Sequence, residues 1–352
     1  MKIVNTPEQL KQYAADALAA SGGHPLLIDK YLPGQEIEVD AVADGDQVLI
    51  PGILEHVERA GVHSGDSIAI YPARHLTPGQ KAALVDYTLR MSRGLKIKGL
   101  LNIQFVLHRG TVYVIEVNPR ASRTVPFLSK VTGVPLVKLA VQVSLGKSLS
   151  DLGYGTGLLS PRNYVAVKVP VFSTGKLPGV EAALGPEMRS TGEVVGFGAD
   201  LPTALWAGFL AAGYEMPRQG TILATVADRD KNEALPYLAQ FAQRGFNLVA
   251  TAGTAAFLAQ HGLKARVVRK VHEQPPHLLT DLSERKVDLV INTVTCGQQA
   301  KRDGFLIRRA AVENSIPCFT SLDTVKAYLT ALDIPASSTP KIQSLQQYLG
   351  QN

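Results

Sequence analysis

Cysteine is scarce in this 352-residue sequence, in which only Cys296 and Cys318 are present. Two cysteines cannot form a disulfide framework, and no C-x-x-C spacing offers a metal or redox site, so we expect both thiols to be reduced. The sequence also lacks any run of eighteen apolar residues, and its start, MKIVNTPEQLKQ, lacks the apolar core of a secretory signal. These absences predict a cytoplasmic globular protein without a membrane segment.

Clusters of basic residues are also missing, although the formal net charge is +6. No Lys/Arg run occurs, and aromatic and basic residues do not interleave, so we expect a mildly basic surface and no nucleic-acid partner. An anionic small ligand fits the same charge equally well. With 45% apolar residues, the chain is long enough to bury a substantial core in two or three domains.

The first 215 residues carry both helix and strand signals. Thr6-Pro7, followed by Gln9, predicts a helix that ends at Gly22-Gly23, and Thr77-Pro78 predicts a helix that runs through Arg90. Further helices are expected at 136–145 and 202–213, a loop at 153–163, and antiparallel strands at 25–32, 36–43 and 47–57 with a turn at Asp44-Gly45. This mixture predicts an α+β domain.

The pattern changes at the segment GYEMPRQG (213–220), where proline and glycine interrupt the apolar periodicity. We therefore divide the chain into a domain at 1–215 and a second domain at 216–352. From Thr221 onward, short apolar strands alternate with helical stretches, and the strands are predicted at 221–228, 246–253, 265–271, 287–293 and 317–321. This alternation is typical of a parallel, doubly wound α/β sheet.

The stretch NIQFVLHRGTVYVIEVNPRASRTVPF (102–127) predicts a hairpin with polar residues on one face. A three-residue loop, His108-Arg109-Gly110, would pair Leu107 with Thr111 and place Gln104 opposite Val114. Because side chains alternate between faces, an apolar face is expected from Leu101, Ile103, Phe105, Tyr113, Ile115 and Val117. The opposite face would carry Asn102, Gln104, Glu116 and Asn118 and look into a cleft.

The polar face of this hairpin offers hard oxygen ligands. Gln104, Glu116 and Asn118 suit Mg²⁺ shared with nucleotide phosphates better than they suit zinc or copper. The planar guanidinium groups of Arg120 and Arg123, just past the strand end, can meet phosphate or carboxylate oxygens. On spacing alone, a half-exposed hairpin whose polar face meets only water remains the alternative.

Two further segments are candidates for nucleotide contacts. The run EHVERAGVHSGDS (55–67) follows a strand and contains glycines and small polar residues that allow a backbone to approach a ligand, although a plain surface loop is the alternative. The segment Asp29 to Leu32 is similar to a linker strand beside an adenine pocket. In such a pocket, backbone groups of Lys30 and Leu32 would contact the base and Glu36 the ribose.

Five motifs in order resemble the large chain of carbamoyl phosphate synthetase, specifically its second, carbamate-phosphorylating half and the regulatory domain that follows. These motifs are YLPGQEIEVDAV, EHVERAGVHSGDS, GLLNIQFV, VIEVNPRASRTVPFLSKVTGVPL and LGPEMRSTGEVVG. The resemblance covers nearly the whole chain. Biotin-carboxylase-like proteins share the Glu-x-Asn-x-Arg element but do not continue as SRTVPFLSK.

This resemblance implies an ATP-grasp fold, in which ATP lies between two α+β lobes, with Mg²⁺ or Mn²⁺ as the metal. It implies that ATP is contacted by Lys30, Leu32, Glu36, Gly61, Val62, His63, Ser64, Gln104 and Glu116. It further implies that Gln104, Glu116 and Asn118 bind the metal, and that Arg120 and Arg123 hold the carbamate and the transferring phosphoryl group. Phosphoryl transfer depends mainly on positioning and charge neutralisation, which metal ions and arginines supply.

For the second domain, the resemblance implies a methylglyoxal-synthase-like regulatory domain. Its usual effector in the family is UMP, and IMP competes for the site in some members. The nucleotide contacts implied here are Lys231, Thr251, Thr254, Lys270, Asn292 and Thr295. Thr/Gly turns that merely cap helices are the alternative.

Several family features are missing from this sequence. The family's ATP-grasp unit has an upstream domain and a glycine-rich lid, so we expect this chain to be a C-terminal portion that makes no carbamoyl phosphate alone and needs the upstream portion. The complete enzyme also has a glutaminase small subunit as partner. Val169 stands where ornithine-activated relatives carry glutamate, which argues against ornithine activation, although Glu58 and Asp66 match other positions of that site. The stretches HEQPPHLLTDL and NTVTCG lack the acidic residues of methylglyoxal synthases, which argues against a lyase.

A rival hypothesis is a nucleotide-binding regulatory module in which residues 1–215 serve only as a docking scaffold.

Overall fold

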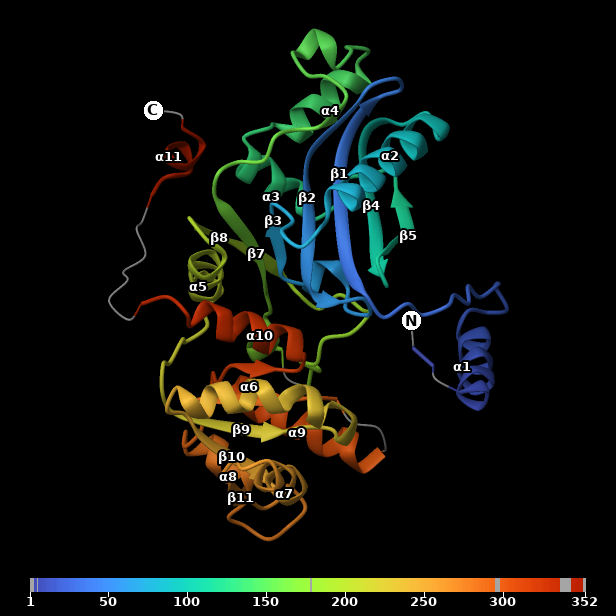
Figure 1. Cartoon of the computed structure of the whole chain (residues 1–352). Helices are drawn as coiled ribbons and strands as arrows, with labels where there is room; N and C mark the ends of the chain where they lie inside the picture. The colour runs from blue at the N-terminus through green and yellow to red at the C-terminus, as the bar shows by residue number, and fades with distance from the viewer. Residues whose placement is uncertain (1–2, 5, 178, 295–297, 336–342, 351–352) are drawn as a thin grey trace.

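The computed structural model describes residues 3–4, 6–177, 179–294, 298–335 and 343–350. Two sheets stand one above the other in Figure 1. The eight-stranded sheet has the order β5-β4-β1-β2-β3-β7-β8, with β6 paired to β2, and the five-stranded sheet has the order β11-β10-β9-β12-β13. The expected fold class is confirmed, because the first sheet is antiparallel except for the β2–β6 pair and the second is parallel throughout.

The elements of the first part follow one another along the chain as mixed helices and strands. They are α1 (Pro7–Ala20), β1 (Gln35–Asp44), β2 (Val48–Arg59), β3 (Ala69–Tyr71), α2 (Pro78–Gly94), β4 (Lys98–His108), β5 (Thr111–Asn118), α3 (Thr124–Thr132), α4 (Leu136–Ser144), β6 (Gly157–Leu158), β7 (Val165–Val171), β8 (Gly192–Gly198) and α5 (Leu201–Ala211). The predicted caps are confirmed: the Thr6 hydroxyl accepts from the amide of Gln9, and Thr77 forms a capping box with Gln80. Helix α2 extends four residues beyond the predicted end at Arg90.

The predicted strand at 25–32 is wrong. This segment has no regular secondary structure and belongs to neither sheet, and the side chains of Leu27 and Ile28 are 87% and 62% exposed. The β-forming residues alone could not make a strand here, because a strand also needs a neighbour for its backbone hydrogen bonds. The loop expected at 153–163 is confirmed except for the two-residue strand β6.

The β4–β5 hairpin differs from its prediction in both loop and register. His108 pairs with Thr111, so the loop has two residues, Arg109 and Gly110, at φ of 50° and 82°. Positive φ at both positions suits the tight turn of a twisted hairpin. A bulge at Ile115 then places Gln104 opposite Glu116 instead of Val114.

The bulge also changes which residues face the core. Leu101, Ile103 and Phe105 are fully buried as predicted, but Tyr113 and Ile115 are 42% and 47% exposed on this edge strand. Their predicted place on the apolar face is wrong, because the extra residue reverses the alternation of β5 beyond the bulge.

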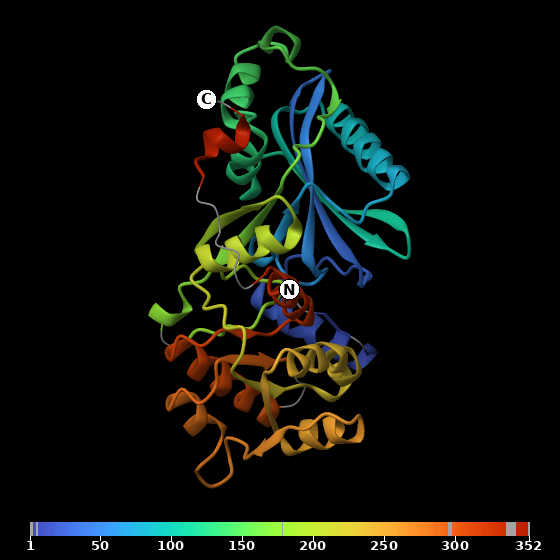
Figure 2. The same cartoon turned by 60° about the vertical axis from the view of Figure 1, so that its left-hand side comes forward.

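Helices cover the two faces of the first sheet, as Figure 2 shows. Helix α2 lies over the face that carries Ile37, Val39 and Ile103, and α3 and α4 lie over the opposite face against Val42 and Leu54. On that second face the apolar packing gives way to polar residues near the start of α3, where the candidate site lies.

The second part alternates strands and helices as predicted. Its elements are β9 (Thr221–Thr225), α6 (Lys231–Gln243), β10 (Asn247–Thr251), α7 (Ala252–Gln260), β11 (Arg266–Val268), α8 (Leu278–Ser283), β12 (Leu289–Asn292), α9 (Gln298–Glu313), β13 (Cys318–Phe319) and α10 (Leu322–Ala331). The central strands β9 and β12 are buried, as expected for a parallel sheet covered on both faces.

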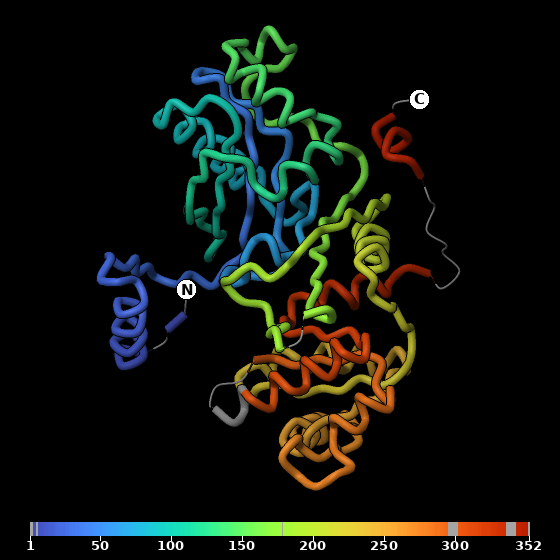
Figure 3. Tube along the Cα trace, turned by 180° about the vertical axis from the view of Figure 1, so that it is seen from behind, coloured from blue at the N-terminus to red at the C-terminus, as the bar shows by residue number. Residues whose placement is uncertain are grey.

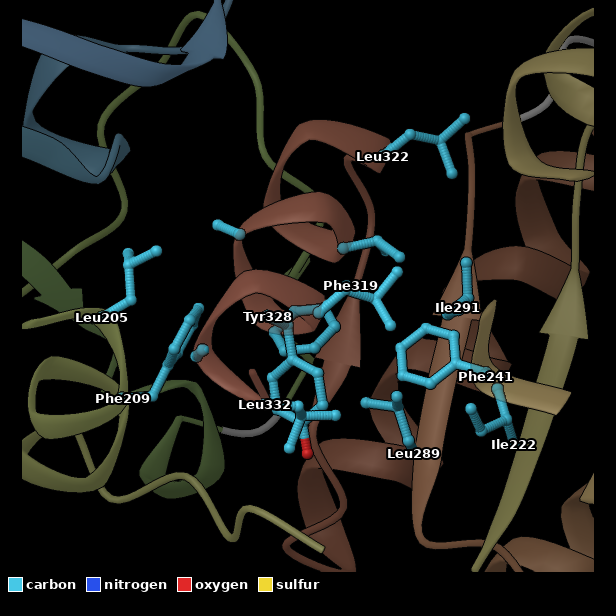
Figure 4. Close-up of a cluster of buried hydrophobic side chains, with 14 of the residues drawn as sticks. Leu205, Phe209, Ile222, Phe241, Leu289, Ile291, Phe319, Leu322, Tyr328 and Leu332 are labelled. Atoms are coloured by element: carbon cyan, nitrogen blue, oxygen red, sulfur yellow. The ribbon is translucent and has the colours of Figure 1, made fainter. Parts of the chain in front are cut away.

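The two parts share one hydrophobic cluster. Figure 4 shows Leu205 and Phe209 of α5 on one side of Phe319 and Tyr328, with Ile222 of β9 on the other. The rings of Phe209 and Tyr328 meet edge to face at 5.7 Å. Burial of these large side chains is the main favourable contribution to holding the parts together.

The N-terminal helix stands apart from the main body in Figure 3, whereas the C-terminal helix packs against it. Helix α1 stands off near the start of β1, whereas α11 (Leu345–Leu349) returns to the first part and stacks Tyr348 on Phe197 at 4.4 Å. Within the described residues no single helix is long and apolar enough to cross a membrane. Helices α3 and α4 together reach that length and apolar composition, but the chain bends between them.

Candidate functional site

The register of three strands aligns polar residues in two rows across the first sheet. Glu38 on β1 lies opposite Gln104 on β4, which lies opposite Glu116 on β5. In the second row, Asp40 lies opposite Asn102, which lies opposite Asn118. Directly opposed side chains share a face, so all six project from the face that α3 and α4 cover further along.

The predicted metal ligands are Glu116 and Asn118 at the outer ends of these rows and Gln104 in the middle of the first row. The Asn118 side chain donates to Glu116 Oε1 at 2.8 Å, and the Gln104 side chain donates to the Ser64 hydroxyl at 3.1 Å. Glu116 is exposed, and Gln104 and Asn118 are half-buried. Side-chain oxygens on one accessible face are the donor set that Mg²⁺ prefers, so these residues fit a hard divalent ion.

Nitrogen and sulfur ligands do not contribute to this set. Among the described residues, no group of three or more His, Cys, Asp or Glu is arranged to hold a metal ion. An ion at Glu116 would therefore depend on neighbouring amide oxygens and on ligand oxygens, as expected for an ion bound together with phosphates.

The inner ends of the rows form a buried acidic layer. Asn102 donates from one nitrogen to Glu38 Oε1 at 2.8 Å and to Asp40 Oδ1 at 2.9 Å. Burial and the charge of Glu38 raise the pKa of Asp40. Burial opposes ionisation of Glu38 as well, but the hydrogen bond and charge of His56 outweigh it and lower the pKa of Glu38. The pair therefore holds one firmly ionised carboxylate beside one that is easily protonated.

This acidic layer anchors the start of α3. Ser122 donates to Asp40 Oδ1 at 2.7 Å, and Thr124 donates to Glu38 Oε1 at 3.0 Å. Since Arg123 lies between these two residues, the contacts fix the backbone that carries its guanidinium.

Two basic residues border the acidic layer. His56 is fully buried, with Nε2 3.2 Å from Glu38 Oε2 and Nδ1 4.0 Å from Glu36 Oε1. Lys168 on β7 is also buried, and its ammonium donates to the carbonyl of Ser64 at 3.0 Å. Burial lowers the pKa of Lys168, and the charge of Glu38 opposes this shift. The Lys168 ammonium offsets part of the negative charge beneath the candidate metal ligands.

The two predicted arginines have different surroundings. Arg123 Nη1 donates to the Ser190 hydroxyl at 3.0 Å and also contacts the Met188 sulfur, so it reaches the segment before β8. Arg120 is exposed and donates to the carbonyl of Ala121 at 3.0 Å. Its backbone amide donates to the carbonyl of Asn118 at 2.8 Å, which forms a tight turn at the end of β5.

The predicted adenine segment meets the predicted loop. Tyr31, between Lys30 and Leu32, donates its hydroxyl to the carbonyl of Ala60 at 2.7 Å. Gly61 has a φ of 113°, and a Cβ there would lie 3.5 Å from the Tyr31 hydroxyl. The chain at Tyr31 therefore lies beside the start of the loop Gly61 to Ser64.

That loop has internal and external hydrogen bonds. His63 Nδ1 accepts from the amide of Gly65 at 3.0 Å, and the His63 amide donates to the carbonyl of Gly185 at 2.8 Å. Val62 forms an isolated bridge with Ala60. The His63 ring thus stabilises a turn, in keeping with a structural role for it.

The structure brings together Ser64, Gln104, Glu116 and Asn118, with Arg123 anchored nearby through α3. Glu36 belongs to the same electrostatic group: burial raises its pKa, and the charges of Glu38 and Glu116 raise it further against the opposing charge of His56. No hydrogen bond or ion pair found within the described residues joins Lys30, Leu32 or Arg120 to Gln104 or Glu116.

The site also contains His56, Asp40 and Lys168, which were not predicted from the sequence. The alternation of Glu36, Glu38 and Asp40 in EIEVDAVA was the available signal, because carboxylates at every second position place acid on one face of a strand.

In the second part, several predicted effector residues lie at the carboxyl ends of the strands. Lys231, at the start of α6, donates to the carbonyl of Gly253 at 2.9 Å and pairs with Asp228 at 2.7 Å. Thr251 ends β10 and precedes α7, and Thr254 is buried in the first turn of that helix. This arrangement places an ammonium beside the start of α7, where free backbone amides favour an anion.

Asn292 ends β12 and is buried. Its side chain donates to the Thr225 hydroxyl at 2.7 Å and accepts from Arg308 at 2.6 Å. Lys270 is exposed, and its backbone amide donates to Glu273 at 2.7 Å. Thr295 lies outside the described residues.

The residues relevant to ornithine surround a cavity of about 220 Å³ between the two parts. Glu58, Asp66 and Val169 line it. Glu58 accepts from Thr324 and from the amide of Ile68, and burial raises its pKa.

Comparisons with known proteins agree with the order of the two parts. Residues 1–152 match the family described as carbamoyl-phosphate synthase L chain, ATP binding domain, and residues 233–320 match the MGS-like domain. The carbamoyl phosphate synthase large chain of Clostridium beijerinckii is 52% identical over 328 residues, which cover 93% of this chain and 31% of the relative. The chain therefore spans about a third of the length of this curated relative.

Solved biotin carboxylase domains resemble part of the chain. The domain of a single-chain bacterial carboxylase has a TM-score of 0.42 and 21% identity, and covers 55% of each chain. The domain of Hydrogenobacter thermophilus 2-oxoglutarate carboxylase, in complex with MgADP, ADP and bicarbonate, has a TM-score of 0.43 and 18% identity, over 56% of this chain and 49% of that one. The two family matches and the 52% identity over 93% of the sequence show that this chain is similar to the C-terminal part of a carbamoyl phosphate synthase large chain.

Proposed function

We propose that this chain carries the ATP site at which a carbamoyl phosphate synthase phosphorylates carbamate. The observation that carries the proposal is the register that sets Gln104 opposite Glu116 beside Ser64. We assign Gln104, Glu116 and Asn118 as ligands of Mg²⁺ or Mn²⁺, and the ion would neutralise phosphate charge. The product would serve pyrimidine and arginine biosynthesis in the cytoplasm.

In the proposed reaction a carbamate oxygen attacks the γ-phosphorus of ATP. The new oxygen–phosphorus bond gives carbamoyl phosphate, and the bond to the bridging oxygen breaks to release ADP. Arg123 and Arg120 would hold the carbamate and the transferring phosphoryl group through charged hydrogen bonds. Because Ser122 and Thr124 fix the start of α3 on Asp40, Arg123 would need little reorganisation.

The nucleotide would lie along the loop and the segment that precedes β1. We assign backbone groups of Lys30 and Leu32 to the adenine and Glu36 to the ribose. The loop residues Gly61, Val62, His63 and Ser64 would contact the rest of the nucleotide. The hydrogen bond from Tyr31 to Ala60 supports this assignment, since it holds the two segments side by side.

The second part would bind a regulatory nucleotide, UMP or IMP. We assign Lys231, Thr251, Thr254, Lys270, Asn292 and Thr295 to this site. The lysine beside the start of α7 supports a phosphate there. We divide the chain into a catalytic domain at 1–215 and an effector domain at 216–352. As proposed partners we name the preceding portion of the large chain and the glutaminase small subunit, and neither a nucleic acid nor a membrane.

Calorimetry tests the ATP site directly. We expect ADP to bind the chain in the presence of Mg²⁺ and to lose most of its affinity when EDTA removes the ion. An ADP affinity that is independent of the metal would contradict the assignment. In a second assay, the chain is mixed with the preceding portion of the Clostridium beijerinckii relative, and ATP formation from ADP and carbamoyl phosphate is measured. Metal-dependent binding without any ATP formation would favour a purely regulatory module.

A further inference from the structure

A buried arginine joins the two parts of the molecule. Arg308 lies on α9 with its side chain 5% exposed, and Nη1 donates to Asn292 Oδ1 at 2.6 Å. Its Nε and Nη2 donate to the two carboxylate oxygens of Glu181 at 2.6 and 2.5 Å. A guanidinium held at two points fixes orientation as well as distance. Arg308 therefore ties the end of β12 to the segment that precedes β8.

The segment from Glu181 to Ser190 has no regular secondary structure, so its position depends on specific contacts. Beyond Glu181, the carbonyl of Gly185 accepts from the His63 amide at 2.8 Å. The amides of Arg189 and Ser190 donate to the two oxygens of Asp66 at 2.8 and 2.9 Å. One end of the segment is thus fixed by Arg308, and the other end is fixed on the loop that contains Ser64.

This loop is connected to the candidate metal ligands. The Ser64 hydroxyl accepts from Gln104 at 3.1 Å, and the Ser64 carbonyl accepts from Lys168 at 3.0 Å. Polar contacts and a short stretch of backbone therefore lead from Asn292 in the second part to Gln104 in the first.

Helix α9 has a glycine that makes room for the arginine. A Cβ at Gly304 would lie 2.8 Å from Arg308 Nη1 and 3.7 Å from Asn292 Oδ1. Glycine is unfavourable inside a helix, so its presence here agrees with a need for close packing around the guanidinium.

We propose that Arg308 is the positioning residue that relays ligand binding at Asn292 to the loop at Ser64, an inference that rests on the effector site proposed above. A nucleotide that hydrogen-bonds to Asn292 or to Nη1 of Arg308 replaces the contact between these two residues, whereas Glu181 stays paired with Nε and Nη2. The released guanidinium can then move together with Glu181, which shifts the segment at 181–190 and, through it, the loop. A ligand acts in this way when it binds one arrangement of the arginine better than the other.

The neighbouring arginine provides a matched control. Arg309 donates to the carbonyl of Thr174 at 2.9 Å and to the Glu313 carboxylate at 2.8 Å. Glu313→Gln therefore removes a carboxylate partner from an arginine on the same helix without touching the Arg308 contacts. Glu181→Gln makes the same chemical change on the proposed relay.

The experiment is hydrogen–deuterium exchange on the full chain, with and without UMP, for the wild type, Glu181→Gln and Glu313→Gln. Without ligand, we expect Glu181→Gln to speed exchange at 63–67 about tenfold, because a charged hydrogen-bond partner is lost. We expect Glu313→Gln to leave these amides unchanged. Equal exchange at 63–67 in the two variants would overturn the relay.

Addition of UMP separates the relay from the effector site. In the wild type, UMP should slow exchange at 251–254 and alter exchange at 63–67, whereas Glu181→Gln should keep the first effect and lose the second. A change at 63–67 that persists in Glu181→Gln would contradict the relay. If UMP does not change exchange at 251–254 in the wild type, the proposed effector site is wrong. The comparison of the two variants without ligand then still shows whether Glu181 holds the loop at 63–67.

Gly304→Ala covers the case in which Glu181→Gln does not fold. The added methyl group should displace Arg308 from Asn292 and leave its pair with Glu181 in place. We expect near wild-type exchange at 63–67 without ligand and no response there to UMP. A full response to UMP in this variant would contradict the relay.

Discussion

The two candidate sites of this chain use their sheets in different ways. In the first part, the site lies on the face of an antiparallel sheet, where strand register decides that Gln104 meets Glu116. In the second part, the site lies at the carboxyl ends of parallel strands, where Thr251 and Asn292 are terminal residues. The first site therefore depends on pairing of side chains, whereas the second depends on strand order and on backbone groups at the start of a helix.

The difference also concerns buried charge. The first site lies above Glu38 and Asp40. Both carboxylates are buried, and both accept a hydrogen bond from Asn102. In the second site the charges of Lys231 and Lys270 lie nearer the surface. Substitutions of Glu38 or Asp40 should therefore affect folding as well as binding, whereas those of Lys231 or Lys270 should affect binding mainly.

The largest expected effect is on stability, from Asp40→Ala. This change removes the Asp40 acceptor from Asn102, Ser122 and Thr124 and leaves a space in the buried layer, so it should lower the free energy of unfolding by about 3 kcal/mol. Thr251→Ala is the counterpart in the second part, and should cost less than about 0.5 kcal/mol because its side chain caps no helix amide. Urea unfolding measures both, and equal losses would remove the contrast between the two sites.

Glu116→Gln tests the exposed part of the first site and leaves the buried carboxylates Glu38 and Asp40 unchanged. Glu116 is exposed, so the variant should fold normally and lose at least about tenfold in affinity for Mn²⁺ with ADP. Calorimetry measures the affinity, and Glu284→Gln, an exposed glutamate paired with Lys286, is the control. Unchanged affinity in Glu116→Gln would remove this carboxylate from the metal site.

Lys231→Gln tests the second site in the same way. Loss of its ammonium should weaken UMP binding about fivefold and leave binding of ADP to the first site unchanged. The smaller effect is expected because backbone amides at the start of α7 still contribute to phosphate binding. An equal loss for both nucleotides would indicate general destabilisation instead of a separate effector site.

The pH dependence of stability should distinguish the buried pair. Because the folded pKa of Asp40 is raised from 3.8, the folded state holds a proton that the unfolded state has released, so the contribution of Asp40 to stability falls as the pH rises above about 4. Glu38, with its pKa lowered from 4.5, contributes in the opposite direction, and its contribution is lost as the pH falls below that value.

Asp40→Asn isolates the contribution of Asp40 to the pH dependence of stability. The wild-type unfolding free energy minus that of Asp40→Asn should decrease between pH 4 and pH 8, as measured by urea unfolding. A difference that increases over this range would show that Asp40 is ionised more easily in the folded protein than in the unfolded chain.

The smallest effect concerns the corrected face of the hairpin. Val112 is buried and Ile115 is 47% exposed, so Val112→Ala should cost about 1 kcal/mol and Ile115→Ala clearly less. Thermal unfolding compares the two variants. A larger loss of stability for Ile115→Ala than for Val112→Ala would show that Ile115 lies on the buried face, as simple alternation predicts.

Local signals predicted much of the fold, and long-range contacts explain the errors. The caps at Thr6 and Thr77 were sufficient for their helices because capping is decided within four residues. The strand predicted at 25–32 failed because its residues have no strand beside them. The hairpin register failed because no residue in TVYVIEV marks the bulge at Ile115.

The candidate site divides in the same way. Gln104, Glu116 and Asn118 could be found because they lie in one hairpin, and the bulge brings Gln104 and Glu116 directly opposite each other. His56 and Lys168 reach the site from other strands, and only the pairing of the whole sheet brings them to Glu38 and Ser64. Sequence spacing carries no signal for such contacts.

The most direct test of the account is to locate a bound Mn²⁺ ion by NMR. In the presence of ADP, Mn²⁺ should broaden the signals of Gln104, Glu116 and Asn118 most strongly, with weaker broadening at Ser64 and none in the second part. Broadening centred elsewhere while ADP is bound would contradict the claim that this face of the sheet holds the metal and the nucleotide together.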